Sequence, residues 1–112
     1  MFESPLAPEK LEEILSALRT GLEDLLGDQL EAVYLYGSHA RGEAQPDSDI
    51  DVLVVLKEDF DYSDVLNKTS TLASDLSLQN DTVISCVFVT KADFLNRRTP
   101  LLINIRREGV KV

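Results

Sequence analysis

The stretch VYLYGSHARGEAQPDSDIDVLVV, residues 33–55, contains two apolar runs joined by a polar connection. The runs at 32–36 and 50–56 are rich in valine, leucine and tyrosine, a composition that predicts β-strands. The second run is almost continuously apolar, which indicates a strand buried on both faces. Gly37 ends the first strand, and the connection over 39–48 contains glycine and proline. The fold is therefore expected to be built around this pair of strands.

Helices are predicted on both sides of this pair in the sequence. Leucine and isoleucine recur every three or four residues over 8–26, which predicts a helix with one apolar face. Pro8 suits the first turn of this helix, and Gly27 suits a left-handed stop. A less regular pattern of the same kind predicts a second helix over 61–79. Two long helices are thus available to cover the strands.

The C-terminal third of the chain is predicted to contain one more strand and two more helices. The run TVISCVFV, residues 82–89, predicts the third strand. Thr90 is expected to cap the helix that follows, and Thr99, followed by proline, to cap a last helix. Three apolar residues of this last helix are expected to face the core: Leu101, Leu102 and Ile105.

This order of elements indicates an α/β (α+β) fold, with helices packed on a small mixed sheet of three to four strands. At 112 residues, the chain is expected to be a single domain, 1–112. No apolar run approaches the roughly 18 residues that span a bilayer, and the first residues lack the pattern of a secretory signal. Cys86 is the one cysteine, so no internal disulfide is possible. A soluble, cytoplasmic protein without membrane association is expected.

The net charge of -9 argues against general nucleic-acid binding, because phosphate backbones are held by clustered lysine and arginine. Residues 91–112 differ, since six basic and two acidic residues give them a charge of +4 and leave -13 for residues 1–90. This segment is interpreted either as the basic end of a helix or as a docking surface or phosphate-facing patch.

Two carboxylates, Asp49 and Asp51, stand at the start of the second strand. Successive side chains of a strand alternate between faces, so these two are expected on one face, about 7 Å apart. Carboxylates at this spacing repel each other unless a cation offsets the repulsion. Oxygen ligands of this kind suit Mg²⁺, which usually completes its shell with water and substrate phosphates. The pair is therefore a candidate magnesium site.

The turn after the first strand is a candidate phosphate site. Gly37 has no β-carbon, so a ligand can approach its backbone closely, and Ser38 offers a hydroxyl and an N–H. Arg41 is expected either to neutralise phosphate charge or to hold the loop by bonding to aspartate or to backbone carbonyls. Tyr34 and Tyr36 are ordinary strand aromatics, either of which could also stack on a base.

The motifs GSHARG at 37–42 and SDID at 48–51 resemble G-S-x-A-R-G and S-D-x-D of the minimal nucleotidyltransferases, in the polymerase-beta-like superfamily. The resemblance implies the nucleotidyltransferase fold and ATP or another nucleoside triphosphate as substrate. The resemblance implies that nucleotide is bound by Gly37, Ser38, Arg41 and Ser48. It implies catalysis and magnesium binding by Asp49 and Asp51.

The third strand departs from that pattern. Members of the superfamily generally carry a third carboxylate on this strand, where it helps to activate the acceptor, but TVISCVFV contains no acid. Alternation along the strand indicates that Ser85 faces the first two carboxylates. Asp81, just before the strand, is the nearest candidate for a third acid. Either Asp81 or a group from a partner is expected to complete the site.

The resemblance also implies a function in a pair of proteins. Minimal nucleotidyltransferases commonly accompany a helical HEPN protein as antitoxin and toxin, and the expected reaction is AMP transfer from ATP to a hydroxyl of that partner. The alternative is a catalytically degenerate nucleotidyltransferase that binds nucleotide and partner without chemistry, as the missing third carboxylate favours. A homo-oligomer is a further possibility that the sequence leaves open.

Overall fold

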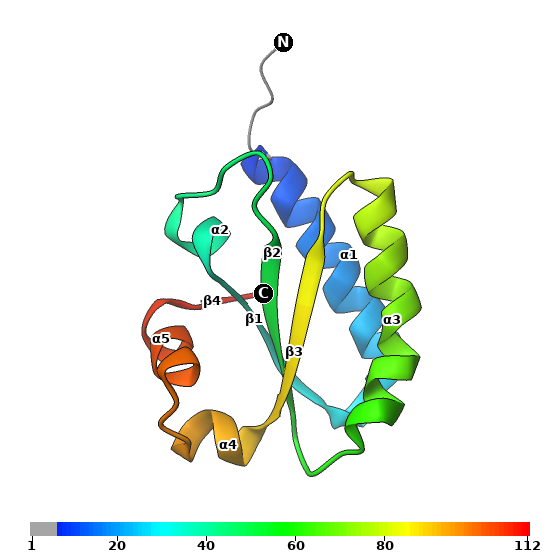
Figure 1. Ribbon diagram of the computed structural model, residues 1–112. Helices are drawn as coiled ribbons and strands as arrows, with labels where there is room; N and C mark the ends of the chain where they lie inside the picture. Colours follow the sequence, from blue (N-terminus) through cyan, green and yellow to red (C-terminus); the bar gives the residue numbers. More distant parts are fainter. Residues whose placement is uncertain (1–6) are drawn as a thin grey trace.

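The computed structural model describes residues 7–112, in which four strands form one sheet in the order β3-β2-β1-β4 (Figure 1). β1 is antiparallel to both β2 and β4, whereas β2 and β3 are parallel. The sheet is therefore mixed and has helices on it, which confirms the predicted α/β (α+β) class. The strands are β1 (Leu30–Tyr36), β2 (Ile50–Leu56), β3 (Ile84–Thr90) and β4 (Val110–Lys111).

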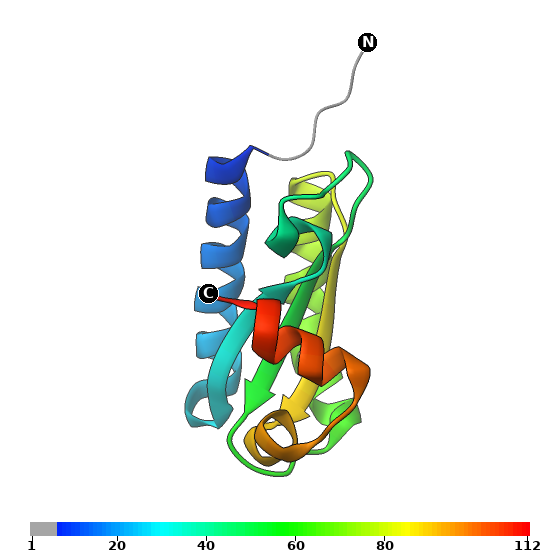
Figure 2. The same cartoon turned by 90° about the vertical axis from the view of Figure 1, so that its left-hand side faces the viewer.

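Helices cover both faces of this sheet (Figure 2). α1 and α3 lie on one face and bury the larger apolar cluster, while α4 and α5 cover the other face with a smaller cluster. The short α2 follows β1 directly, at the end of the sheet where β2 begins (Figure 1). The helices are α1 (Pro8–Leu26), the 3-10 turn η1 (Gly27–Gln29), α2 (Ser38–Arg41), α3 (Tyr62–Gln79), α4 (Lys91–Asn96) and α5 (Pro100–Glu108).

β2 forms the centre of the core, as its apolar sequence predicts. Val52, Val54 and Leu56 point into the α1–α3 cluster, whereas Leu53 and Val55 point into the α4–α5 cluster. All five are at most 1% exposed. Because both faces of β2 are packed, its register is fixed, and the residues at its start are held in defined positions.

The element boundaries agree with the sequence to within one residue except at the starts of β1 and β3. β1 begins at Leu30, earlier than the predicted 32–36, and β3 spans 84–90 instead of 82–89. The shift in β3 has a backbone cause, since residues 80 and 81 form the turn that ends α3 and Asp81 adopts a φ of 50°. The predicted start of α1 at Pro8 and its end before Gly27 are confirmed, but Gly27 combines a positive φ of 55° with a ψ of -127°, which is not the left-handed helical conformation that was expected.

Both predicted caps in the C-terminal third are confirmed. The Thr90 Oγ1 accepts the Asp93 N–H at 3.1 Å, and the Thr99 Oγ1 accepts the Leu102 N–H at 3.3 Å. The expectation that Leu101 faces the core is wrong, because it is 40% exposed whereas Leu102 and Ile105 are buried. Leu102 and Ile105 define the inward side of α5, and Leu101, about 100° around the helix from Leu102, lies at the margin of that side.

None of the helices within residues 7–112 combines the length and apolar character needed to cross a membrane. The expectation that the first residues lack a secretory signal falls partly on residues 1–6, which lie outside the described part of the chain. The α4–α5 hairpin is held together by a bond from the Arg106 guanidinium to the Phe94 carbonyl.

Candidate functional site

A row of three side chains crosses the sheet at the start of β2. Asp51 is the register partner of Tyr36 on β1 and of Ser85 on β3. Register partners in a sheet share a face, and the next residues inward, Tyr34 and Leu53, belong to the α4–α5 cluster. The row therefore lies on the α4–α5 face, with Asp51 in the middle.

The turn after β1 brings its backbone against Asp51. Gly37 has φ 76° and ψ -156°, a conformation that glycine adopts without strain, and α2 begins at the next residue, Ser38. A β-carbon on Gly37 would overlap the Asp51 carboxylate, whose Cγ would lie 3.2 Å away. Glycine is thus required twice at this position, for its dihedral angles and for the approach of the carboxylate. The two motifs found in the sequence are in contact here.

The charge of Asp49 acts on the neighbouring carboxylate of Asp51. Asp49 lies exposed just before β2, and Asp51 is partly buried. Burial raises the pKa of Asp51 above its usual range, the charge of Asp49 raises it further, and His39 and Arg41 act in the opposite direction. A cation beside both carboxylates would offset the repulsion that raises this pKa.

Ser48 closes the loop that carries the second motif. Its Oγ accepts the Gln45 N–H at 2.8 Å, and its own N–H donates to the Gln45 carbonyl at 3.0 Å. His39 lies 3.3 Å from the Ser48 carbonyl through Nε2, which ties α2 to the same loop. The loop is therefore held in place by its own side chains. Nucleotide binding by Ser48 stays a prediction.

Arg41 lies at the end of α2 and bonds to a residue that the sequence did not single out. Its Nε donates to Glu43 Oε2 at 3.1 Å, in place of the expected bond to aspartate or a backbone carbonyl. The ion pair is exposed, so it contributes little to stability and leaves the guanidinium available to a stronger anion. Neutralisation of a bound phosphate by Arg41 stays a prediction.

A cavity of about 220 Å³ opens beside the Gly37 turn. α2 and the end of β1 form one wall, and α5 forms the other with residues three and four apart in sequence, hence on one side of the helix. The sequence predicted a core position for Leu101 and indicated no role for Asn104 or Glu108. The lining residues are Tyr36, Gly37, Ala40, Arg41, Leu101, Asn104, Ile105 and Glu108.

The structure does not bring a third acid to Asp49 and Asp51. Within residues 7–112, no three His, Cys, Asp or Glu side chains form a group that could hold a metal ion. Asp81 is exposed in the turn after α3, and Ser85 stands beside Asp51 on β3. A role for Asp81 as third acid stays a prediction.

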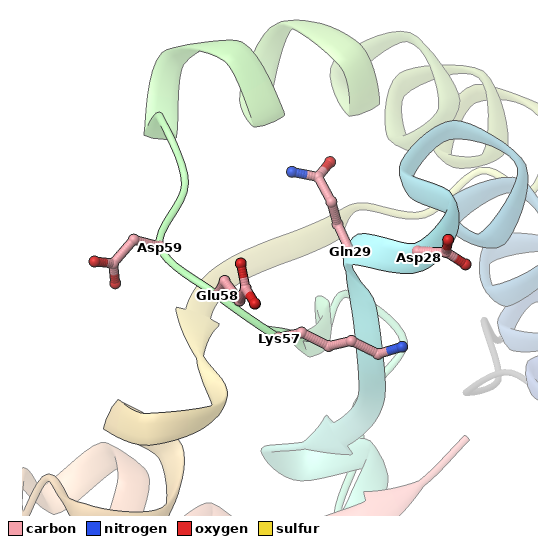
Figure 3. Close-up of a pocket in the computed structure, with 5 residues that line it drawn as sticks. All are labelled: Asp28, Gln29, Lys57, Glu58 and Asp59. Carbon is pink, nitrogen blue, oxygen red and sulfur yellow. The ribbon is translucent and has the colours of Figure 1, made fainter.

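A second pocket, of about 470 Å³, lies at the opposite end of β2 (Figure 3). Its lining residues are Asp28, Gln29, Lys57, Glu58 and Asp59. Lys57 is six residues along from Asp51, roughly 20 Å in an extended strand, so this pocket is separate from the motifs. Figure 3 shows Asp59 pointing away from the other four side chains. Although it is larger, this pocket lacks the glycine turn and the paired acids, and we place the functional site at Asp51.

Comparisons with known proteins show the family of the chain. Residues 20–99 match the family described as Polymerase beta, Nucleotidyltransferase. MJ0141 of Methanocaldococcus jannaschii, named as a candidate protein adenylyltransferase, is 32% identical over 100 residues, which are 89% of this chain and 96% of that protein. Residues 20–99, which match the family, include both motifs and the row across the sheet.

Two solved structures share the fold at low sequence identity. A toxin-antitoxin crystal structure with AMP-PNP has a TM-score of 0.63 and 23% identity, over 86% of this chain and 69% of that one. A tri-AMPylated Shewanella oneidensis HEPN toxin in complex with MNT antitoxin has a TM-score of 0.50 and 21% identity, over 89% of this chain and 66% of that one. The chain thus belongs to the Polymerase beta, Nucleotidyltransferase family and is a nucleotidyltransferase.

Proposed function

We propose that this nucleotidyltransferase moves AMP from ATP to a hydroxyl of a HEPN partner protein, uses Mg²⁺, and acts as the antitoxin of that pair in the cytoplasm. The observation that carries the proposal is the contact of the Gly37 backbone with the Asp51 carboxylate. This contact joins a candidate phosphate site to a candidate metal site, as a metal-bound triphosphate requires.

The residues at Asp51 fit magnesium. Two carboxylates next to each other, with the pKa of Asp51 raised by burial and by Asp49, form a donor set that a divalent cation would stabilise. Two protein ligands are typical for Mg²⁺, since water and substrate phosphates fill the remaining positions. Asp49 and Asp51 would hold the ion, and the ion would stabilise negative charge on the phosphate oxygens.

The chain's own residues would position the donor. Gly37 and Ser38 would bind the terminal phosphates, with Arg41 and Ser48 in the same loop region. The acceptor oxygen would attack the α-phosphorus in line, forming a new P–O bond as the bond to the bridging oxygen breaks. The electron pair would leave with pyrophosphate, and the hydroxyl proton would pass to solvent.

Two findings support a protein acceptor. The relative that the chain covers almost completely is named as a candidate protein adenylyltransferase. One structure that shares the fold is an MNT antitoxin bound to an AMPylated HEPN toxin, and another is a toxin-antitoxin with an ATP analogue. A homo-oligomer is not required by the proposal.

The second candidate function is a degenerate nucleotidyltransferase that binds nucleotide and the HEPN partner without transfer. The absence of a three-ligand metal group within residues 7–112, with Ser85 beside Asp51, favours this alternative. In the proposed enzyme, Asp81 or a group of the partner completes the site.

Mass spectrometry of the HEPN partner after co-expression tests the proposal. A gain of one or more AMP groups that disappears with Asp51→Asn is the expected result, because the variant removes a charge from the metal site. An unmodified partner that is still inhibited, together with magnesium-dependent ATP binding by the wild type, would establish the binding function instead.

A further inference from the structure

We propose that the open edge of β3 binds an extended segment of the partner protein, and that this segment presents the acceptor hydroxyl to Asp51. The inference rests on the proposed AMP transfer and adds the side from which the acceptor arrives and the conformation in which it binds. Its basis is the free backbone of β3, the uncharged sequence of that strand and the position of the donor site.

β3 is an edge strand along its whole length. It pairs with β2 on one side, from Ile84 to Thr90, and no other strand of residues 7–112 pairs with it. An unpaired strand of seven residues presents a row of backbone donors and acceptors, the surface that peptides use when they add a strand to a sheet.

The outward backbone groups of β3 can be identified from its bonds to neighbouring segments. The Ile50 N–H donates to the Val83 carbonyl at 2.8 Å, so the backbone of Val83 faces β2. Groups alternate along a strand, and Ile84, Cys86 and Phe88 therefore direct their N–H and C=O groups away from β2. The Ile84 N–H donates to Ser77 Oγ on α3 at 3.1 Å. The outward groups of Cys86 and Phe88 remain for an added strand.

The sequence of β3 lacks the features that usually prevent pairing at an edge. ISCVFVT contains no lysine, arginine, aspartate, glutamate or proline. At the opposite edge, β4 has two residues, and one of them is Lys111. Short edge strands and edge lysines protect against added strands, whereas a long uncharged edge invites them. The difference makes β3 the receptive edge of this sheet.

The chemistry requires the acceptor to come from the β3 side. In-line displacement places the attacking oxygen opposite the leaving pyrophosphate. The proposed phosphate site at Gly37 and Ser38 follows β1, so the opposite side of Asp51 is the side of β3 and Ser85. An acceptor on an added strand would arrive in that direction.

The spacing of strands places the acceptor on the face of Asp51. Neighbouring strands lie about 4.8 Å apart, so an added strand would run roughly 10 Å from β2. A side chain beside Ser85 on the added strand would share the face of Asp51, so an acceptor hydroxyl at that position would lie on the side of the proposed metal site.

Two synthetic peptides test the inference with the wild-type protein. The first is Thr-Val-Thr-Tyr-Thr-Val-Thr with capped ends, and the second is identical except for N-methyl groups on the amides that would face β3. We expect the first, at millimolar concentration, to shift the Cys86 and Phe88 amide resonances and slow their hydrogen exchange at least tenfold. The Val110 and Lys111 amides at the other edge serve as controls. The methylated peptide should bind at least tenfold more weakly, and with Mg²⁺ and ATP only the first should gain AMP.

The outcomes separate the two proposals. Docking at the β3 edge would be overturned if both peptides shifted the Cys86 and Phe88 amides equally. It would also be overturned if the protein bound ATP but the first peptide left these two amides unchanged. Protection of these amides without AMP transfer would support the docking site and count against catalysis. Failure of the wild type to bind ATP with magnesium would overturn the proposed function and, with it, this inference.

Discussion

The two sides of Asp51 are built differently. On the β1 side, Tyr36 is the strand neighbour of Asp51, and the Gly37 turn lies against the Asp51 carboxylate. Arg41 and α5 line the cavity beside this turn. On the β3 side, Ser85 is the neighbour, and the strand beyond it carries no charge and no further partner. The difference indicates that the chain supplies the donor half of the site itself and takes the acceptor half from another molecule.

The largest expected effect is at the junction of the two sides. Asp51→Asn should reduce AMP transfer to the HEPN partner about a thousandfold, because charge stabilisation by a metal is worth several kcal/mol and each 1.36 kcal/mol is about tenfold in rate. The measurement is transfer of radiolabelled AMP under single-turnover conditions, with circular dichroism to establish folding.

Asp47→Asn is the matched control for this variant, since it removes one carboxylate from the same loop outside the proposed site. Its transfer rate should stay within about twofold of wild type. AMP transfer by Asp51→Asn at the wild-type rate would show that Asp51 is not part of the catalytic site.

A second prediction tests whether β3 is packed on the side opposite Ser85. Cys86 packs against the α1–α3 cluster, and burial raises the pKa of its thiol to about 11. The ordinary value is 9.0, so at pH 8 the thiolate fraction is about a hundredfold lower than in the unfolded chain. Labelling by a thiol reagent should be slower in folded protein by about this factor, measured against protein in urea.

The same thiol gives a pH dependence of stability with a defined sign. The folded state binds the Cys86 proton more tightly, so the stabilisation is present below pH 9 and falls as the pH rises toward 11. Cys86→Ala should remove this part of the pH dependence in urea titrations. If the Cys86 thiol of native protein were labelled as fast as in urea, β3 would have to separate from the α1–α3 cluster in the folded state. The face of β3 that carries Cys86 would then not be stably packed.

A third prediction concerns the close approach on the β1 side. Gly37→Ala combines a φ of 76° with a collision against Asp51, whereas Gly42→Ala has a φ of 72° and no atom within 4 Å of the new carbon. Both should lose about 1 kcal/mol of stability from backbone strain. Gly37→Ala alone should lose a further 1–2 kcal/mol or so and about tenfold in ATP affinity, because the carboxylate must move. Urea titration and calorimetry measure the two effects, and equal behaviour of the variants would contradict the argument.

Much of the fold was predictable because local and global signals coincide. The run 50–56 is apolar on both faces, and Thr90 and Thr99 cap helices as their positions indicate. Leu101 was not predictable, since helical spacing cannot distinguish a side facing the sheet from one facing a cavity formed with α2. The turn at Asp81 was hidden for a different reason, because a positive φ in a residue other than glycine has no clear sequence signal.

The site was predictable where chemistry depends on adjacent residues and less so where it depends on the fold. Gly37 and Asp51 were recognised from two motifs, and the sheet register brings them together. Asn104 and Glu108 reach the same cavity only because α5 folds back over the sheet. The open edge of β3 is a property of strand order, which the sequence alone does not give.

The smallest expected effects decide how the β3 side is completed. Ser85→Asp places a third carboxylate beside Asp51, so metal affinity should rise about tenfold, while the metal-free protein should lose about 1 kcal/mol from repulsion. Ser85→Asn is the neutral control of similar size and should change neither quantity appreciably. Asp81→Asn should leave metal affinity within about twofold, because Asp81 is exposed in the turn after α3 and forms no metal-binding group with Asp49 and Asp51. Calorimetric titration with Mn²⁺ measures the metal affinity of all three variants. A tenfold loss of metal affinity in Asp81→Asn would show that Asp81 supplies the third acid, and no group of the partner would then be needed.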